Sequence, residues 1–177
     1  MHQDPATQPP ANDPLPLPPP PELAPLPFAE PWGYEIHFPR DPRGPRVARI
    51  ALRAVLASHG LDELTERAEL LATELATNAV RHTAGPASLH LDWTCPALRV
   101  SVRDRSPGLT FARGGVPGGP HPLPPQDAID GRGLLLLDVL ADRWDGCALG
   151  DGPWGPGGKT IWFELLWEGK PPPALAA

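Results

Sequence analysis

The chain has 177 residues, 28 of them proline, and carries a formal net charge of −6 at pH 7. This length suits one domain with some excess chain. The negative charge argues against a nucleic-acid or anionic membrane surface as the main partner. No apolar run approaches the roughly 18 residues that a membrane-spanning helix needs. The two cysteines make neither a disulfide framework nor a metal cluster, so a cytoplasmic location is expected.

Proline is concentrated towards the two ends of the chain. Residues 1–33 are Pro-rich and nearly free of β-branched residues, so they bury too little apolar surface to order themselves. They predict a mobile, partly polyproline tail that is either a spacer or a ligand for an aromatic groove. Residues 169–177 form a second, flexible Pro/Ala tail, which leaves the folded domain at residues 34–168.

The domain is predicted to open with a strand and a helix. Alternation predicts the strand at Tyr34–Phe38. Asp41 as N-cap and Pro42 in the first turn then predict a helix that runs to about His59, before Gly60. Its apolar face is expected to consist of Val47, Ile50, Ala51 and Ala54.

A basic stripe lies beside this expected apolar face. It consists of Arg46, Arg49 and Arg53, which recur at steps of three and four residues. Such a stripe is either a solvated helix face or a contact surface for an acidic partner protein, and both interpretations stay open at this point.

The next helix, from Asp62 to about His82, carries polar residues along the margin of its buried face. The apolar positions recur at helical spacing and are Leu64, Ala68, Leu71, Leu75 and Ala79. Glu74, Asn78 and His82 lie four residues apart beside them. Because burying an unpaired amide costs on the order of 1–3 kcal/mol, Asn78 should have a partner, either elsewhere in the protein or in a bound ion.

The second half of the domain is predicted to consist mainly of strands. The expected elements are a hairpin of Ala87–Trp93 and Leu98–Asp104, a lid-like loop over residues 105–130, a short apolar helix after Gly131-Arg132-Gly133, and strands at Arg143–Leu149 and Thr160–Trp167. This order predicts an α+β fold, a two-layer α/β sandwich with a mixed, mostly antiparallel sheet and helices on one face.

Four motifs in this order each have a use at a nucleotide: Glu74-x-x-x-Asn78-x-x-x-His82, Asp104-x-Ser106-x-Gly108, Gly131-Arg132-Gly133 and Gly158-Lys159-Thr160. A carboxylate at a strand end can accept a hydrogen bond from an exocyclic amine such as that of adenine. A Gly-x-Gly that opens a helix presents backbone N–H groups to phosphates. Mg²⁺ takes few protein oxygens, so one amide oxygen from Asn78 suffices.

Together the four motifs resemble the GHKL nucleotide-binding superfamily, and most closely its small bacterial anti-sigma-factor serine/threonine kinases. The likeness covers about Tyr34 to Trp167. It implies a Bergerat-type sandwich that binds ATP and Mg²⁺, with Asn78 as the magnesium ligand, Asp104 as the adenine reader and Glu74 as the general base. The other residues that the resemblance implies at ATP are His82, Gly108, Gly131, Arg132, Gly133, Leu134 and Thr160.

The resemblance also implies a function and partners. The implied function is phosphorylation of a small antagonist protein and sequestration of a sigma factor or similar partner, with a homodimer as a further possibility. Ser106 stands where the family pattern Asp-x-Gly-x-Gly has its first glycine. This departure keeps open a catalytically inactive interaction module. A histidine-kinase-like ATPase domain is the third interpretation.

Overall fold

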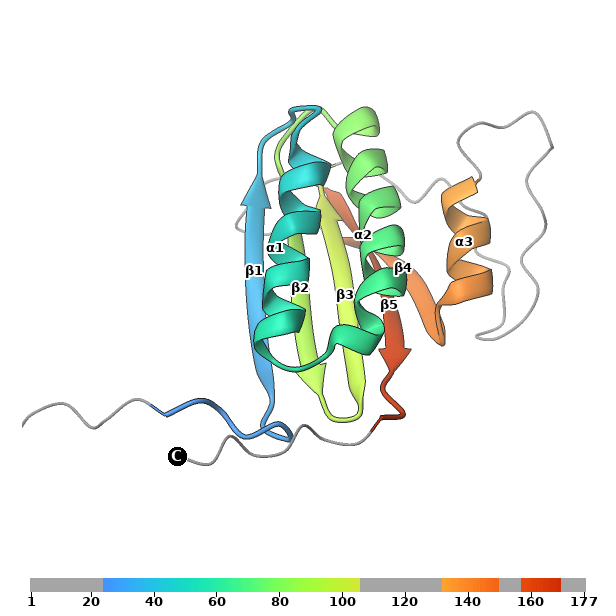
Figure 1. Cartoon of the computed structure of the whole chain (residues 1–177). Helices are drawn as coiled ribbons and strands as arrows, with labels where there is room; N and C mark the ends of the chain where they lie inside the picture. The colour runs from blue at the N-terminus through green and yellow to red at the C-terminus, as the bar shows by residue number, and fades with distance from the viewer. Residues whose placement is uncertain (1–23, 106–131, 150–156, 170–177) are drawn as a thin grey trace, which may run out of the picture.

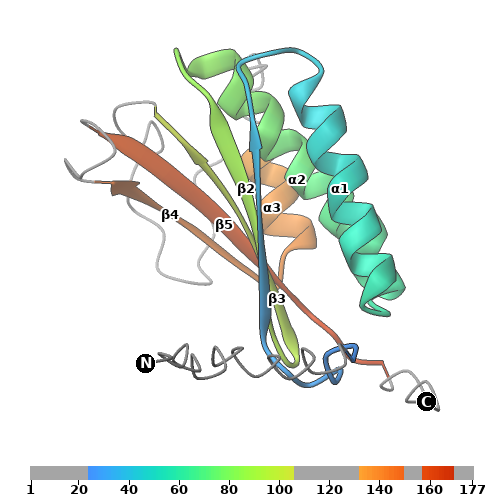
Figure 2. The same cartoon turned by 90° about the vertical axis from the view of Figure 1, so that its left-hand side faces the viewer.

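A single layer of helices covers one face of a five-stranded sheet (Figures 1 and 2). The computed structural model describes residues 24–105, 132–149 and 157–169. In chain order the elements are β1 (Trp32–Phe38), α1 (Gly44–Ser58), α2 (Asp62–His82), β2 (Ala87–Thr94), β3 (Ala97–Asp104), α3 (Arg132–Leu140), β4 (Arg143–Leu149) and β5 (Gly158–Leu166). The order of predicted elements is confirmed, and so is the two-layer sandwich.

The strands of the sheet are arranged in the order β1-β2-β3-β5-β4, and each neighbouring pair is antiparallel. The β2–β3 hairpin closes with Thr94 opposite Ala97, at the predicted turn. Alternate residues of each strand face the helices. On β3, Leu98, Val100 and Val102 face this way and are buried.

α2 is the central element of the helical layer. It contacts α1 and α3 within that layer and β2, β3 and β5 beneath it. Its buried residues are Leu64, Ala68, Leu71, Ala72, Leu75, Ala76 and Ala79, and four of these seven are alanines. Small side chains at a packing interface let a helix lie close to its neighbours. Among the described helices, none is both long and apolar enough to cross a membrane.

The expected apolar face of α1 was wrong. Val47 and Ile50 are 54% and 56% exposed, and Ala54 is exposed as well. The residues that α1 buries are Gly44, Pro45, Ala48, Leu52 and Leu56. The expected set and the buried set both have helical spacing. In the structure, Leu52 and Leu56 pack against α2 and the sheet, and Val47 and Ile50 face the solvent. The larger apolar area that the two leucines bury stabilises this orientation.

The N-cap of α1 also differs from the expectation. α1 begins at Gly44 with Arg43 at the N-cap position, so Asp41 is not the cap. Asp41 instead accepts hydrogen bonds from the Arg43 backbone N–H at 2.8 Å and from its guanidinium. These bonds hold the pKa of the Asp41 carboxyl well below its ordinary value. Leu61 takes the N-cap position of α2, and Asp62 lies in the first turn, where a carboxylate favours the positive end of the helix.

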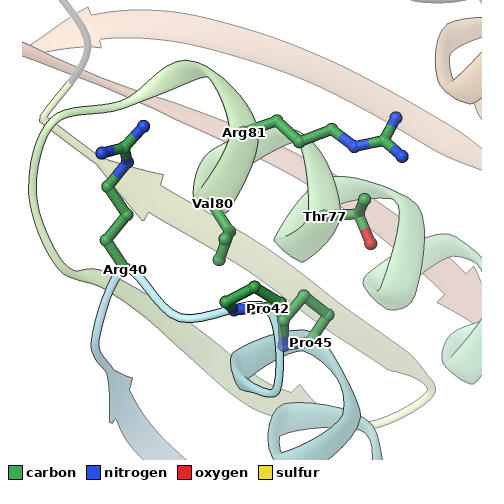
Figure 3. Close-up of a pocket in the computed structure, with 6 residues that line it drawn as sticks. All are labelled: Arg40, Pro42, Pro45, Thr77, Val80 and Arg81. Carbon is green, nitrogen blue, oxygen red and sulfur yellow. The ribbon is translucent and has the colours of Figure 1, made fainter.

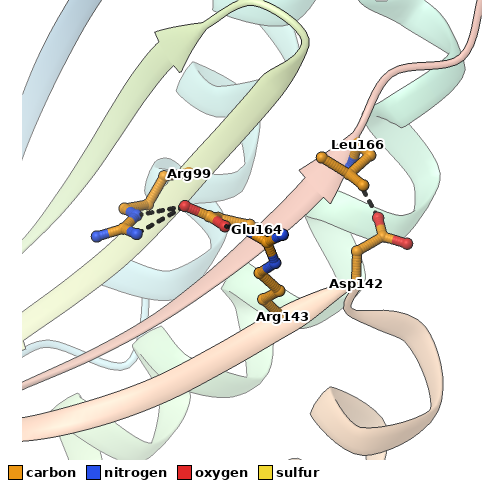
Figure 4. Close-up of polar contacts among 5 residues, drawn as sticks. All are labelled: Arg99, Asp142, Arg143, Glu164 and Leu166. Carbon is orange, nitrogen blue, oxygen red and sulfur yellow. Dashed lines mark hydrogen bonds and ion pairs between the residues drawn. The ribbon is translucent and has the colours of Figure 1, made fainter. Parts of the chain in front are cut away.

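Polar contacts join the edge strand β4 to the rest of the sheet (Figure 4). Glu164 of β5 accepts two hydrogen bonds from Arg99 of β3, at 2.9 and 2.6 Å, and forms an ion pair with Arg143 of β4 at 3.7 Å. Just before β4, Asp142 accepts the Leu166 backbone N–H at 2.7 Å. Asp142 therefore fixes the point at which the chain leaves α3 and enters the sheet.

An aromatic cluster lies at the hairpin end of the sheet. Phe28, which precedes β1, packs edge-on against Trp93 with ring centroids 5.3 Å apart, and it lies 4.6 Å from Trp167. The Trp93 indole donates a hydrogen bond to the Phe28 carbonyl at 2.8 Å. The segments before β1 and after β5 are thereby held together on β2.

The corrected orientation of α1 predicts opposite outcomes for two neighbouring alanine substitutions. Leu52→Ala removes a fully buried side chain and is expected to lower the free energy of unfolding by about 2–5 kcal/mol. Ile50→Ala, at an exposed position, is expected to change it by no more than about 0.5 kcal/mol. Urea denaturation of both variants measures this. A larger loss for Ile50→Ala than for Leu52→Ala would contradict the orientation of α1 described above.

Candidate functional site

One flank of α2 faces α3 and carries the polar residues that the sequence singled out. Arg67 marks this flank, since its guanidinium lies 3.4 Å from the Leu140 carbonyl oxygen and 3.5 Å from Asp142. Glu74 and Asn78 follow Arg67 by seven and eleven residues. At about 3.6 residues per turn these spacings return to the same side of the helix. Glu74 and Asn78 therefore point towards the α3 side of α2.

Asn78 and Glu74 are both half-buried, and neither forms a hydrogen bond or ion pair with another residue in the described ranges. The amide that was expected to need a partner thus has none within the described part of the protein. An amide and a carboxylate one turn apart thus keep hydrogen-bonding capacity that water or a ligand can use. His82, one turn beyond Asn78, is exposed at the end of α2.

Asp104 ends β3 with its side chain on the helix-covered face of the sheet. It continues the alternation of the buried β3 residues and is only 5% exposed. Lys159 of β5 lies opposite it in the strand register and is 7% exposed. The Lys159 Nζ atom is 3.7 Å from the Asp104 Oδ2 atom. A buried carboxylate is thus charge-compensated by a buried ammonium, as desolvated charges need to be.

Gly158 allows β5 to approach β3 beside this ion pair. A Cβ atom at Gly158 would lie 2.6 Å from the Asp104 carbonyl oxygen, closer than such atoms can come. Glycine has no Cβ, so it is the residue that fits here. The Gly158-Lys159 pair therefore sets both the spacing of the two strands and the cation beside Asp104.

Thr160 points away from Asp104. It lies between Lys159 and Ile161, which are buried towards the helices, so its side chain is on the opposite face of the sheet with Trp162. The structure therefore brings Lys159, not Thr160, next to Asp104. Lys159 belongs to the Gly158-Lys159-Thr160 motif, but the motif alone does not indicate a role for it. Two observations together place Lys159 beside Asp104. The alternation of β5 puts Lys159 on the helix-covered face, and the β3–β5 register puts it opposite Asp104.

Some of the remaining predicted residues lie outside the described ranges. Ser106, Gly108 and Gly131, together with the lid after residue 105, are not described. Arg132, Gly133 and Leu134 form the backbone of the first turn of α3. Figure 1 shows that this helix start, the end of β3, the start of β5 and the last turns of α2 all lie at the same end of the molecule, opposite the aromatic cluster.

The residues at this end of the molecule fit a nucleotide and its magnesium ion chemically. A helix start offers backbone N–H groups to phosphates. Asn78 offers an amide oxygen, and Mg²⁺ is commonly bound by one or two protein oxygens together with substrate phosphates and water. Asp104 supplies an acceptor for an exocyclic amine. The four chain segments thus provide donors and acceptors suited to the separate parts of one ligand.

Comparison with known proteins identifies the family to which these features belong. The sequence model of one protein family, the histidine kinase-like ATPase domain, matches residues 38–163, which is well over half of the chain. The matched segment extends from the last residue of β1 into β5, so it contains α2, Asp104 and Lys159. This match confirms the GHKL resemblance that the four motifs predicted. A comparison with curated proteins finds no match.

The Asp104–Lys159 pair predicts a specific pattern in a double-mutant cycle. Lys159→Met leaves the buried Asp104 carboxylate without its cation and is expected to lower the free energy of unfolding by about 3 kcal/mol. Adding Asp104→Asn removes the uncompensated charge, so the double variant should regain part of that loss. Chemical denaturation of the two single variants and the double variant measures the coupling. Strictly additive losses would contradict an interaction between the two side chains.

Proposed function

The chain belongs to the family of histidine kinase-like ATPase domains, and we propose that it is an ATP-binding regulator of the anti-sigma-factor serine/threonine kinase type. Family membership implies ATP as the ligand. The observation that carries the proposal is the half-buried pair of Glu74 and Asn78 on the α3 side of α2, without a partner in the described ranges. A carboxylate next to an ion-binding amide suits phosphoryl transfer.

Each residue has one task in the proposed reaction. Asn78 holds Mg²⁺ by its amide oxygen, and Asp104 accepts a hydrogen bond from the adenine amine. Lys159 holds Asp104 in place through the ion pair with its ammonium group. The start of α3 binds the phosphates through its backbone N–H groups. When bound, Mg²⁺ neutralises charge on the phosphate oxygens.

Glu74 is the general base of the proposed transfer. It accepts the proton of a serine or threonine hydroxyl while that oxygen bonds to the γ-phosphorus of ATP and the bond to the ADP oxygen breaks. Its half-buried position limits the water around the carboxylate, which strengthens its interaction with the hydroxyl. Without a protein hydroxyl, the same base can orient a water molecule, and the product is then inorganic phosphate.

The proposed partners are proteins. The substrate is a small antagonist protein, and a sigma factor or similar regulator is sequestered in alternation with it. A homodimer is part of the proposal too, because β1 is an edge strand of the described sheet and its outer backbone groups can pair with a second copy.

An interaction module without catalysis is the second candidate, and Ser106 is the observation that favours it. Serine adopts the left-handed backbone conformation less readily than the glycine it replaces in the family pattern. The adenine would then fit less closely. The two candidates differ in whether phosphate is transferred, so the Glu74 experiment below separates them.

Substitution of Asn78 tests the metal ligand. Asn78→Ala is expected to weaken ATP binding in Mg²⁺ buffer at least about tenfold, which corresponds to ~1.4 kcal/mol. Binding in EDTA should be nearly equal for both proteins, because the lost contact acts through the ion. Thr77→Ala on the neighbouring side of α2 is the matched control and should bind like the wild type. Isothermal titration calorimetry measures both, and absence of ATP binding by the wild-type protein would refute the proposal.

Substitution of Glu74 separates catalysis from binding. Glu74→Gln keeps the size of the side chain but removes the base, so ATP binding should persist while phosphate release or transfer from γ-labelled ATP falls by about 10²–10⁴-fold. Glu66→Gln, at an exposed position on the same helix, is the matched control and should retain the wild-type rate. No measurable transfer or hydrolysis by the wild-type protein would favour the interaction module.

A further inference from the structure

A pocket of about 510 Å³ lies between the start of α1 and the last turns of α2. The loop after β1, the start of α1 and the last turns of α2 form it, and its lining residues are Arg40, Pro42, Pro45, Thr77, Val80 and Arg81 (Figure 3). Val80 follows Glu69 by three helical turns, and Glu69 hydrogen-bonds Arg53 of α1. Val80 is therefore on the α1 flank of α2, whereas Arg81 follows Glu74 by seven residues and extends from the side of α2 that carries Glu74.

The pocket has an apolar centre and two positive sides. Val80, Pro42 and Pro45 lie between Arg40 and Arg81, and Figure 3 shows the two arginines at opposite sides of the pocket. Both arginines are exposed, and neither forms an ion pair or hydrogen bond with a residue in the described ranges. Two guanidinium groups thus flank an apolar surface, and neither is paired with a carboxylate of the described ranges.

Two carboxylates of this region, Asp41 and Glu69, are already paired with other arginines. Asp41 is bound by Arg43 at 2.7 Å, and Glu69 is bound by the Arg53 guanidinium. Arg49, one turn after Pro45 on α1, adds a further exposed positive charge. A protein with a net charge of −6 therefore has a locally basic surface here. Charge complementarity favours a negatively charged occupant.

The positions of Arg40 and Arg81 on opposite sides of the pocket favour a protein segment over a compact anion such as phosphate. A compact anion such as phosphate can contact one guanidinium or the other, and it leaves the apolar centre exposed to water. A protein segment can place one carboxylate on each side and an apolar side chain over Val80 and Pro42 between them. Such a segment satisfies both charges and also buries the apolar area.

We propose that this pocket binds an acidic segment of a partner protein, in which two carboxylates flank an apolar side chain. Arg40 and Arg81 each pair with one carboxylate, and the apolar side chain packs against Val80, Pro42 and Pro45. The pocket does not depend on the proposed nucleotide chemistry, because none of its lining residues belongs to that site.

Selection from a randomised peptide library on the full-length protein tests the proposal. The selected peptides should share an acidic–apolar–acidic pattern. A synthetic peptide with the consensus sequence should bind with an affinity, measured by fluorescence anisotropy, that falls at least about tenfold for Arg40→Glu and for Arg81→Glu. Arg103→Glu reverses an exposed arginine on the opposite face of the sheet and is the matched control, with an expected change of no more than about twofold.

Three results would overturn the proposal. The first is a set of selected peptides without acidic enrichment, or with equal affinity for the wild type and both pocket variants. The second is displacement of the peptide by inorganic phosphate at constant ionic strength, which would indicate a simple anion site. The third is a gain in peptide affinity when Asp4→Asn, Asp13→Asn and Glu22→Gln are combined, which would assign the pocket to the chain's own N-terminal segment. ATP binding in Mg²⁺ buffer is measured for Arg40→Glu and Arg81→Glu as well. If both variants still bind ATP, a failure of the peptide proposal leaves the nucleotide proposal unaffected.

Discussion

The packing of α2 against the sheet is the constraint on which the rest of the structure depends. Four alanines on its buried face let the helix lie close to its neighbours, with α1 on one flank and α3 on the other. The polar residues at the margin of that face are consequently neither fully buried nor fully solvated. Asn78 and Glu74 keep their hydrogen-bonding capacity in a partly desolvated setting, which is where electrostatic interactions with a ligand are strengthened.

The two flanks of α2 have different chemistry, although they are separated by only one helix diameter. The α3 flank combines an amide, a carboxylate and, at the end of β3, a buried Asp104–Lys159 ion pair. The pocket between α1 and α2 combines prolines, Val80 and two arginines without partners in the described ranges. Under the two proposals made here, α2 contributes side chains both to the nucleotide site and to the pocket that binds a partner segment.

Local sequence signals predicted the elements well because each has its own periodicity and boundaries. The helix at Asp62–His82 and the hairpin that ends at Asp104 follow from spacing alone. The buried face of α1 does not, since Val47 with Ile50 and Leu52 with Leu56 both have helical spacing, and only packing against α2 and the sheet distinguishes them. The site shows the same limit. That Lys159 rather than Thr160 lies beside Asp104 depends on which strand pairs with β3 and in which register.

The aromatic contacts among Phe28, Trp93 and Trp167 bring the beginning and the end of the described domain to one place. In Figure 1 this place is at the opposite end of the molecule from the last turns of α2 and the start of α3. A fluorophore or fusion protein attached next to either terminal segment would therefore project away from both proposed binding regions. Because Trp167 packs against Phe28, a short linker between the two segments would also permit circular permutation with new ends elsewhere.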